Sequence, residues 1–255
     1  MRSRLLGFTL LFLFFALAAV ILWPASALAP WVESGSKGHW RLSSAEGTVW
    51  NGSGMILSHS SDGTTWQIAQ NIRWQLHPGQ LWRGRLALET SLDQGNALIA
   101  LRTDGITLEQ IDAALPAPML LVLLPGALGR YGWAGTIQAR TNDFTCAWQG
   151  YPCSGEIELV WKDAAVAEVP GSKLGDYRFR LVGEGQAMRV DLSTLSGRLQ
   201  INGSGEIAAN SLRFKGETSA AGADTAALDA MLRTLGSYSG TPGKYLIDYR
   251  EVATN

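Results

Sequence analysis

The sequence contains few of the residues that usually carry enzyme chemistry. Its 255 residues include two cysteines and three scattered histidines, His39, His59 and His77. A nucleophile needs a base and an orienting group beside it, and the sequence has neither a recognisable triad nor a G-x-S-x-G motif. Charged residues are 17% of the chain and the net charge is -1, so no basic surface indicates nucleic-acid binding. We expect a protein without catalytic activity, metal or cofactor.

The two cysteines, Cys146 and Cys153, have six residues between them. A metal pair would need two further ligands, which the distant histidines do not supply. A redox pair usually has two intervening residues rather than six. A structural disulfide fits this spacing best. Because disulfides persist outside the cytosol, the pair predicts an oxidising compartment.

The N-terminal segment is strongly apolar. Residues 5–22 carry no charge, Arg2 and Arg4 precede them, and the next charge is Glu33. As a helix this run would be ~27 Å long, close to the thickness of a bilayer core. The flanking arginines would keep the N-terminus in the cytoplasm. We predict a transmembrane anchor at residues 5–23. A cleaved signal peptide is the alternative, because small residues at positions 25, 27 and 29 resemble a cleavage site.

Alternation of apolar and polar residues predicts a series of β-strands. Residues 137–141 and 157–162 alternate in this way, as strands with one buried and one wet face do. They flank the two cysteines, so we expect a hairpin whose connecting loop is pinned by the disulfide. Further strands are expected at residues 55–58, 71–76, 81–89, 96–102, 174–181, 187–192, 199–207, 212–216 and 244–250. Residues 30–42 are interpreted as strand or loop.

Two segments show the spacing of amphipathic helices. Residues 108–115 place apolar side chains at helical intervals after Thr107, a candidate N-cap. A second helix is expected from Asp224 or Thr225 to Leu235, with Gly236 as its end. The apolar run 119–124 is too short to span a membrane. It is interpreted as a buried helix or strand, with a membrane-touching or partner-touching patch as the alternative.

A short pattern of glycine, polar and apolar residues recurs, and each instance is expected to open a strand after a turn. It begins at glycines 47, 84, 135, 155, 197 and 205. The spacing ranges from 8 to 51 residues, which excludes a solenoid of fixed period. The predicted fold is therefore mainly β. One N-terminal transmembrane helix is followed by a long, curved, largely antiparallel sheet with two short helices packed on it.

Tryptophan is abundant, with ten residues in the chain. Trp50, Trp74, Trp133 and Trp161 are interpreted as fillers of the core or of a sheet face. Because tryptophan also anchors protein interfaces, an interface role stays open.

The order of these features resembles the protein N family of the bacterial type II (general) secretion system. The resemblance rests on the anchor, on a box formed by Gly47, Thr48, Val49, Trp50 and Gly52, and on the cysteine pair. It continues in the Gly155-x-Ile-x-Leu-x-Trp161 segment and in the leucine-rich stretch that ends at Leu235 and Gly236. It covers nearly the whole chain in order.

The resemblance implies a single-span inner-membrane protein with a β-rich periplasmic part. Residues 1–4 would be cytoplasmic, 5–23 the anchor, 24–45 a juxtamembrane segment and 46–255 the periplasmic domain. It also implies an accessory, non-catalytic role in the inner-membrane platform. The expected partners are the other platform proteins and the protein that links them to the outer-membrane secretin.

Two other functions stay open. The glycine-initiated strands also resemble those of AsmA-like proteins, which implies a lipid-binding groove lined by apolar side chains. A carbohydrate-active enzyme would need two carboxylates converging beside tryptophan. Glu156 and Glu158 share one strand face but are interpreted as solvated.

Overall fold

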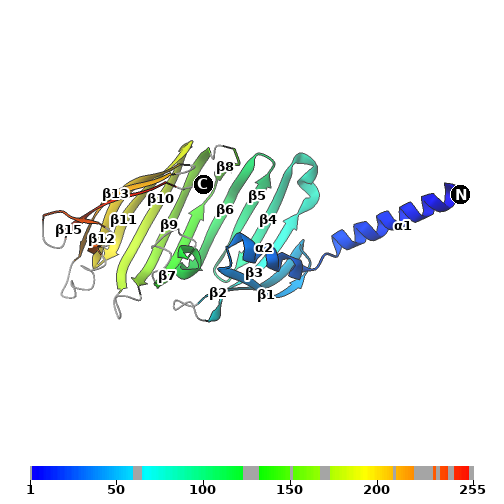
Figure 1. Cartoon of the computed structure of the whole chain (residues 1–255), viewed down its shortest axis with the longest axis horizontal. Helices are drawn as coiled ribbons and strands as arrows, with labels where there is room; N and C mark the ends of the chain where they lie inside the picture. Colours follow the sequence, from blue (N-terminus) through cyan, green and yellow to red (C-terminus); the bar gives the residue numbers. More distant parts are fainter. Residues whose placement is uncertain are drawn as a thin grey trace.

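The computed structural model describes residues 2–59, 65–122, 132–149, 152–166, 173–208, 211–220, 232–233, 236–240 and 244–252. Within these residues, fifteen strands form one antiparallel sheet (Figure 1). Neighbours in the sheet are almost always neighbours in the chain, so the topology is a long meander. The mainly β, antiparallel architecture expected from the sequence is confirmed.

The strands of the first half are β1 (Trp40–Gly47), β2 (Asn51–His59), β3 (Trp66–His77), β4 (Arg85–Leu92), β5 (Gly95–Arg102), β6 (Gly105–Pro116), β7 (Trp133–Thr141) and β8 (Phe144–Ala147). Those of the second half are β9 (Cys153–Val166), β10 (Lys173–Gly185), β11 (Ala187–Gly197), β12 (Leu199–Ala208), β13 (Ser211–Ala220), β14 (Ser237–Tyr238) and β15 (Lys244–Val252). Two strands depart from chain order. The short β8 pairs with β6 and β9, and β14 lies outside β15.

The sheet has one apolar and one charged face. Residues paired across antiparallel strands share a face, so the register assigns each side chain to a side. The apolar face includes a row of paired residues: Ile137 on β7 pairs with Trp161 on β9, which pairs with Tyr177 on β10. The charged face carries cross-strand ion pairs such as Arg180–Glu156, with Nε to Oε1 at 2.6 Å. Alternation along β7, β9 and β10 thus separates core from solvent.

Short helices cover parts of the apolar face. The first core cluster lies under the 3₁₀ helix η1 (Ala25–Leu28) and the helix α2 (Ala29–Gly35), and contains Ala25, Leu42, Ile56, Trp74 and Met119. The helix α3 (Ala117–Leu121) borders the second cluster through its buried Ala117. That cluster contains Ala117, Ile137, Trp161, Ala164, Val166, Leu174, Tyr177, Leu199, Leu232 and Tyr245. Residues 119–121 thus lie in a helix, as expected, but only Met119 is buried, while Leu120 and Leu121 are partly buried. Residues 123–124 lie outside the described residues.

The N-terminal helix α1 (Arg2–Ile21) projects away from the end of the sheet that carries β1 (Figure 1). Its side chains from Phe8 to Val20 are almost all exposed. In the part of the chain that the structure describes, no helix is both long and apolar enough to cross a membrane. The predicted transmembrane anchor is therefore not confirmed.

The helix predicted at residues 108–115 is wrong, because this segment lies within strand β6. A β-bulge explains the misleading pattern. The register on β5 shifts between Leu98, which faces Gln110, and Ile99, which faces Leu108. One extra residue in β6 converts the strand period of two into a spacing of three between Leu108 and Ile111. Apolar side chains on one face of the bulged strand therefore mimic one face of a helix.

Two other boundaries differ from expectation. The strand predicted at 81–89 begins only at Arg85, because Pro78–Arg83 form a 3₁₀ helix, η2, that ends at Gly84 in the left-handed region (φ 68°). Residues 30–42, expected as strand or loop, contain most of α2 before β1 starts at Trp40.

The hairpin around the cysteines is confirmed in outline. β7 pairs with β9, but the connection contains the strand β8, which the sequence did not indicate. The expected helix from 224 or 225 to 235 falls mostly outside the described residues.

The glycine pattern marks strand starts only in part. Gly84 immediately precedes β4, whereas Gly155 and Gly205 lie inside strands, and Gly47 and Gly197 end them. Gly135 sits where the register between β7 and β9 shifts. The expectation that every instance opens a strand is therefore wrong.

Candidate functional site

The box at residues 47–52 forms the tight turn between β1 and β2. Gly47 adopts a left-handed conformation (φ 85°), and a Cβ there would lie 2.5 Å from the Asn51 carbonyl oxygen. The Thr48 amide donates to the Asn51 carbonyl at 2.9 Å, and the Asn51 amide donates to the Thr48 hydroxyl at 3.1 Å. The turn therefore requires glycine at position 47 for its backbone conformation and uses the Thr48 hydroxyl as a hydrogen-bond acceptor.

The same turn holds the end of α1 against the sheet. The Trp50 indole Nε1 donates to the Val20 carbonyl at 2.7 Å, and the Val49 amide donates to the Trp23 carbonyl at 2.9 Å. An isolated bridge pairs Pro24 with Thr48. We call this contact between residues 20–24 and 47–52 the helix–sheet junction.

Proline explains why the helix needs this partner. The Val20 carbonyl would normally accept from the amide four residues later, but that residue is Pro24 and has no N–H. At this helix end it accepts only a long bond, 3.4 Å, from the Trp23 amide. The Trp50 indole supplies a donor for this helix-end carbonyl.

Strand β3 supports the junction from the other side. The Trp74 indole donates to the Val49 carbonyl at 3.0 Å, and the Leu76 amide donates to the Trp50 carbonyl at 2.7 Å. Trp74 is buried and its ring packs directly against Gly52. A Cβ on residue 52 would lie 2.6 Å from that ring. Gly47, Thr48, Val49, Trp50 and Gly52 are therefore brought together in one structural unit.

The remaining residues of the family pattern lie elsewhere. Cys146 and Cys153 form a disulfide and face each other in register on β8 and β9, so the predicted disulfide is confirmed. Gly155 follows two residues later, against the backbone of Asp143 and Phe144. A Cβ at Gly155 would lie 2.1 Å from the Asp143 carbonyl oxygen, so glycine permits this close strand approach.

Trp161 belongs to the second core cluster. Its ring meets Trp133 edge-to-face at 5.3 Å between centroids, and its Nε1 donates to the Ala134 carbonyl at 3.0 Å. The neighbouring Tyr177 hydroxyl donates to the Leu199 carbonyl at 2.9 Å, and burial raises the pKa of this phenol. Trp161 thus acts as a core residue, as interpreted, and so does Trp74, while Trp50 and Trp133 are half-buried.

Gly236 lies at a third place, against β15. Its amide donates to the Leu232 carbonyl at 2.9 Å, and a Cβ there would lie 2.6 Å from the Leu246 carbonyl oxygen. The residues of the family pattern therefore form no single cleft. They occupy the helix–sheet junction, the disulfide corner, the core and the far end of the sheet.

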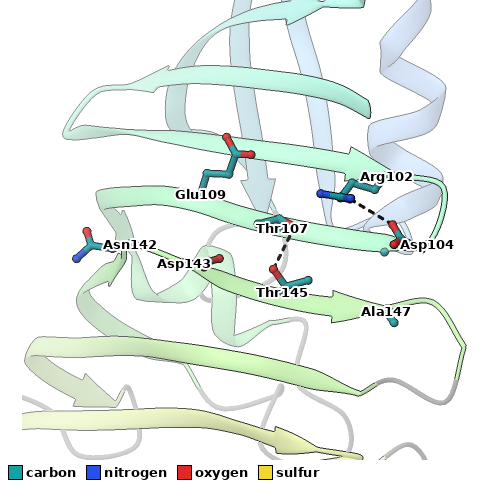
Figure 2. A pocket seen from close by; sticks show the side chains of 9 residues that line it. Arg102, Asp104, Thr107, Glu109, Asn142, Asp143, Thr145 and Ala147 are labelled. Atoms are coloured by element: carbon teal, nitrogen blue, oxygen red, sulfur yellow. Dashed lines mark hydrogen bonds and ion pairs between the residues drawn. The ribbon is translucent and has the colours of Figure 1, made fainter. Parts of the chain in front are cut away.

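An open cavity of about 590 Å³ lies beside β6 and β8 (Figure 2). The Arg102 Nε and the Asp104 Oδ1 are 3.3 Å apart, and the Thr145 hydroxyl donates to that of Thr107 at 3.1 Å. The described lining includes no histidine, cysteine or serine, and the Asp104 side chain is 74% exposed. Groups in such a solvated setting lack the desolvation that activates acids and bases, so we assign no reaction to this cavity.

Carboxylates with lowered pKa values hold turns and strands together. Hydrogen bonds from Asn71, first that of its backbone amide and then those of its side-chain amide, lower the pKa of Asp93. The hydrogen bond from Arg180 lowers the pKa of Glu156, which therefore serves as an ion-pair partner on the charged face. Glu158 pairs with Arg178 at 3.4 Å on the same face. Among the described residues, no three His, Cys, Asp or Glu side chains come together as a metal site.

Sequence reasoning missed two features of this region. It gave no sign that Trp50 would reach the carbonyl of Val20, thirty residues earlier. It also assigned residues 81–89 to a strand, which hid the exposed turn η2. The Pro78-Gly79 dipeptide predicts a turn after the strand at 71–76, but the pattern does not show that this turn extends to Arg83 as a 3₁₀ helix.

The fold and the junction define a single-sheet β protein joined to an apolar N-terminal helix. A family model described as "Type II secretion system (T2SS), protein N" matches residues 38–248. The match covers most of the sheet, and the chain belongs to this family of type II secretion components. No curated protein and no solved structure matches the chain.

Proposed function

We propose that this protein is an accessory, non-catalytic component of the inner-membrane platform of the type II secretion system. It contributes to export of folded proteins by contacting other platform proteins and the protein that links them to the secretin. The observation that carries this proposal is the family match over residues 38–248. The scattered positions of the family-pattern residues also favour a structural role, because catalysis would need them to converge.

The proposed attachment to the membrane runs through residues 5–23. The exposed apolar side chains of α1, such as Phe8 (74%) and Phe12 (74%), support it. A helix that is apolar on all sides needs an apolar surrounding, and a bilayer supplies one. Residues 1–4 would then be cytoplasmic, 24–45 juxtamembrane and 46–255 periplasmic.

The disulfide supports the proposed topology. Cys146 and Cys153 are oxidised, which fits a periplasmic location for β8 and β9. Membrane-impermeant maleimide applied to intact cells checks it. A cysteine introduced at Ser239 should react, and one introduced at Ser3 should react only after the membrane is permeabilised. The opposite result would contradict the topology.

In-membrane crosslinking in the native host tests the partner assignment. A photo-crosslinking residue at Trp31 on α2, at Ile68 on β3 or at Tyr238 on β14 samples three separate exposed positions. Crosslinks to platform proteins from at least one position are expected, and that position identifies the docking side. If all three positions yield no platform protein while expression is normal, the proposed assembly role is wrong.

A lipid-binding groove is the second candidate. The apolar face continues across β10 and β11, where Phe179, Leu181, Val190 and Leu192 are only half-buried. Such a strip offers a surface for an acyl chain. Native mass spectrometry of the full chain in detergent checks this function. Retained phospholipid that is lost in Val190→Asp would favour the groove, and equal retention by both proteins would argue against it.

A further inference from the structure

The turn η2 between β3 and β4 presents two adjacent apolar side chains to solvent. Leu81 is 50% exposed and Trp82 is 75% exposed. Single exposed apolar residues are ordinary on protein surfaces, but a leucine and a tryptophan together at one turn form a small apolar tip. We call Leu81 and Trp82 the apolar tip.

The turn that carries the apolar tip is well fixed. Gly84 closes it in the left-handed region, and its amide donates to the Leu81 carbonyl at 2.9 Å. The Thr103 amide donates to the Gly84 carbonyl at 3.2 Å, and Arg85 hydrogen bonds to Gln80. Because the backbone is already ordered, little conformational entropy is lost when the tip meets another surface.

The strand that leads into the apolar tip is hydrogen-bonded to the helix–sheet junction. Leu76, two residues before η2, donates its amide to the Trp50 carbonyl at 2.7 Å. Trp50 in turn donates its indole to the Val20 carbonyl at the end of α1. Figure 1 shows α1 extending away from this end of the sheet, which also holds β3 and β4. A short chain of hydrogen bonds thus connects the apolar helix to the strand that bears the tip.

The chemistry of the tip matches the surface of a lipid bilayer. Tryptophan is enriched where membranes meet water, because its ring is apolar and its N–H is polar. The Arg83 guanidinium stacks over the Trp82 ring at 4.3 Å from the centroid. In the headgroup layer of a bilayer this guanidinium could form hydrogen bonds to lipid phosphates beside the Trp82 ring.

We propose that Leu81 and Trp82 insert into the surface of the bilayer that holds α1, so that the sheet rests on the membrane at a second point. This inference depends on the proposed anchoring by residues 5–23. It adds an orientation to that proposal: the end of the sheet with the β3–β4 turn faces the lipid. The sheet then cannot rotate freely about the helix–sheet junction, which fixes the side that faces other platform proteins.

Lipid-borne quenching of a site-specific probe tests the inference. The full chain is reconstituted in nanodiscs of phosphatidylethanolamine and phosphatidylglycerol, with nitroxide lipids labelled near the headgroup in one sample and in the middle of the acyl chain in another. A bimane probe is attached at Trp82→Cys, and the described native cysteines do not compete because they are paired in the disulfide. Leu81→Cys is a second site in case Trp82→Cys does not fold.

Two further labelled variants serve as controls. Ile68→Cys lies near the other end of β3 and is 60% exposed, so it matches the tip in exposure but not in position. Phe12→Cys in α1 reports insertion of the helix itself. We expect the acyl-chain nitroxide to lower the emission of the probe at position 12 and the headgroup nitroxide to lower it at position 82. Neither should change the emission at position 68.

The outcomes separate this inference from the anchor. The probe at position 12 could be quenched while the probes at 81 and 82 emit no less than the probe at 68. This outcome would leave the anchor intact and overturn the membrane contact of the tip. Absence of quenching at 12 and at the tip would overturn both. Equal quenching at 68 and 82 would mean that the whole sheet lies near lipid, which also contradicts the proposed orientation.

Discussion

The Trp50 indole nitrogen lies 2.7 Å from the carbonyl oxygen of Val20 and donates a hydrogen bond to it. Pro24 cannot supply the helical N–H that this carbonyl would otherwise accept. The Trp23 amide donates to the same carbonyl at 3.4 Å, so the Trp50 bond is the shorter of the two and joins α1 to the β1–β2 turn.

Trp50→Phe removes this donor and keeps a smaller aromatic ring at the same position. We expect the orientation of α1 relative to the sheet to broaden, with a small loss of stability of about 0.5–1.5 kcal/mol for one hydrogen bond. Spin labels at Phe12→Cys and Ile68→Cys measure the distance distribution by pulsed electron paramagnetic resonance. Trp148→Phe is the matched control, since it removes an indole bond to the Arg102 carbonyl remote from α1. Equal distributions in all three proteins would show that the Trp50 bond does not fix the helix.

Gly52→Ala tests the packing beneath the junction. The new methyl group would lie 2.6 Å from both the Trp74 ring and the Glu46 carbonyl oxygen. We expect a loss of about 1–3 kcal/mol in the free energy of unfolding, the usual cost of overpacking. Urea denaturation followed by circular dichroism measures it. Gly79→Ala is the control, because nothing lies within 4 Å of its Cβ position, and a similar loss in both variants would contradict the argument.

Local patterns predicted strands well wherever the strand was regular. β12 begins at the expected residue, Leu199, because its apolar residues Leu199, Ile201 and Ile207 fall on alternate positions of one regular strand. β6 was mistaken for a helix because a bulge changes the spacing between Leu108 and Ile111. A bulge depends on the partner strand, so no pattern within β6 alone could reveal it.

The candidate site was predictable in its residues but not in its geometry. The resemblance selected Gly47 to Gly52, and the structure gives each glycine a steric reason. The partner of Trp50, however, is a backbone carbonyl thirty residues away, and backbone carbonyls leave no mark in a sequence. The same holds for the exposure of Trp82, which depends on a 3₁₀ turn that shifts the start of β4.

Trp161→Ala should be among the most damaging substitutions in the sheet. It removes a ring that is only 7% exposed, its contact with Trp133 and its hydrogen bond to Ala134. Truncation of a buried aromatic costs about 3–5 kcal/mol. Chemical denaturation measures the change, with Trp148→Ala as the comparison because Trp148 is 48% exposed. A loss no greater than that of Trp148→Ala would mean that Trp161 is not a principal core residue.

Asp93 gives the turn between β4 and β5 a dependence on pH. Hydrogen bonds from Asn71 lower its pKa in the folded state below the ordinary value of 3.8. The stabilisation is therefore fully present above that value and is lost as the pH falls through the lowered pKa. Because solvent screens this exposed carboxylate, we expect its hydrogen bonds to contribute less than ~1 kcal/mol to the free energy of unfolding.

Asp93→Asn measures that contribution. The difference in melting temperature from the unsubstituted protein should be constant between neutral pH and about pH 5, and should shrink on further acidification. Glu206→Gln, an exposed carboxylate substitution on β12, is the control. A difference that grows as the pH falls would have the wrong sign and would contradict the assignment.

The disulfide gives a prediction that separates stability from function. Cys146→Ser should lower the free energy of unfolding by ~2.5 kcal/mol, the chain-entropy value for a loop of this length. Cys153→Ser should lower it equally, because either change opens the same loop between β8 and β9. Denaturation of both single variants and the double variant measures this, and the double variant should lose no more than either single one. An additive loss would mean that the thiols contribute separately and that the bond is not the source of stability.

Since the junction lies on the distant strands β1 to β3, secretion at a permissive temperature should remain close to normal in all three variants.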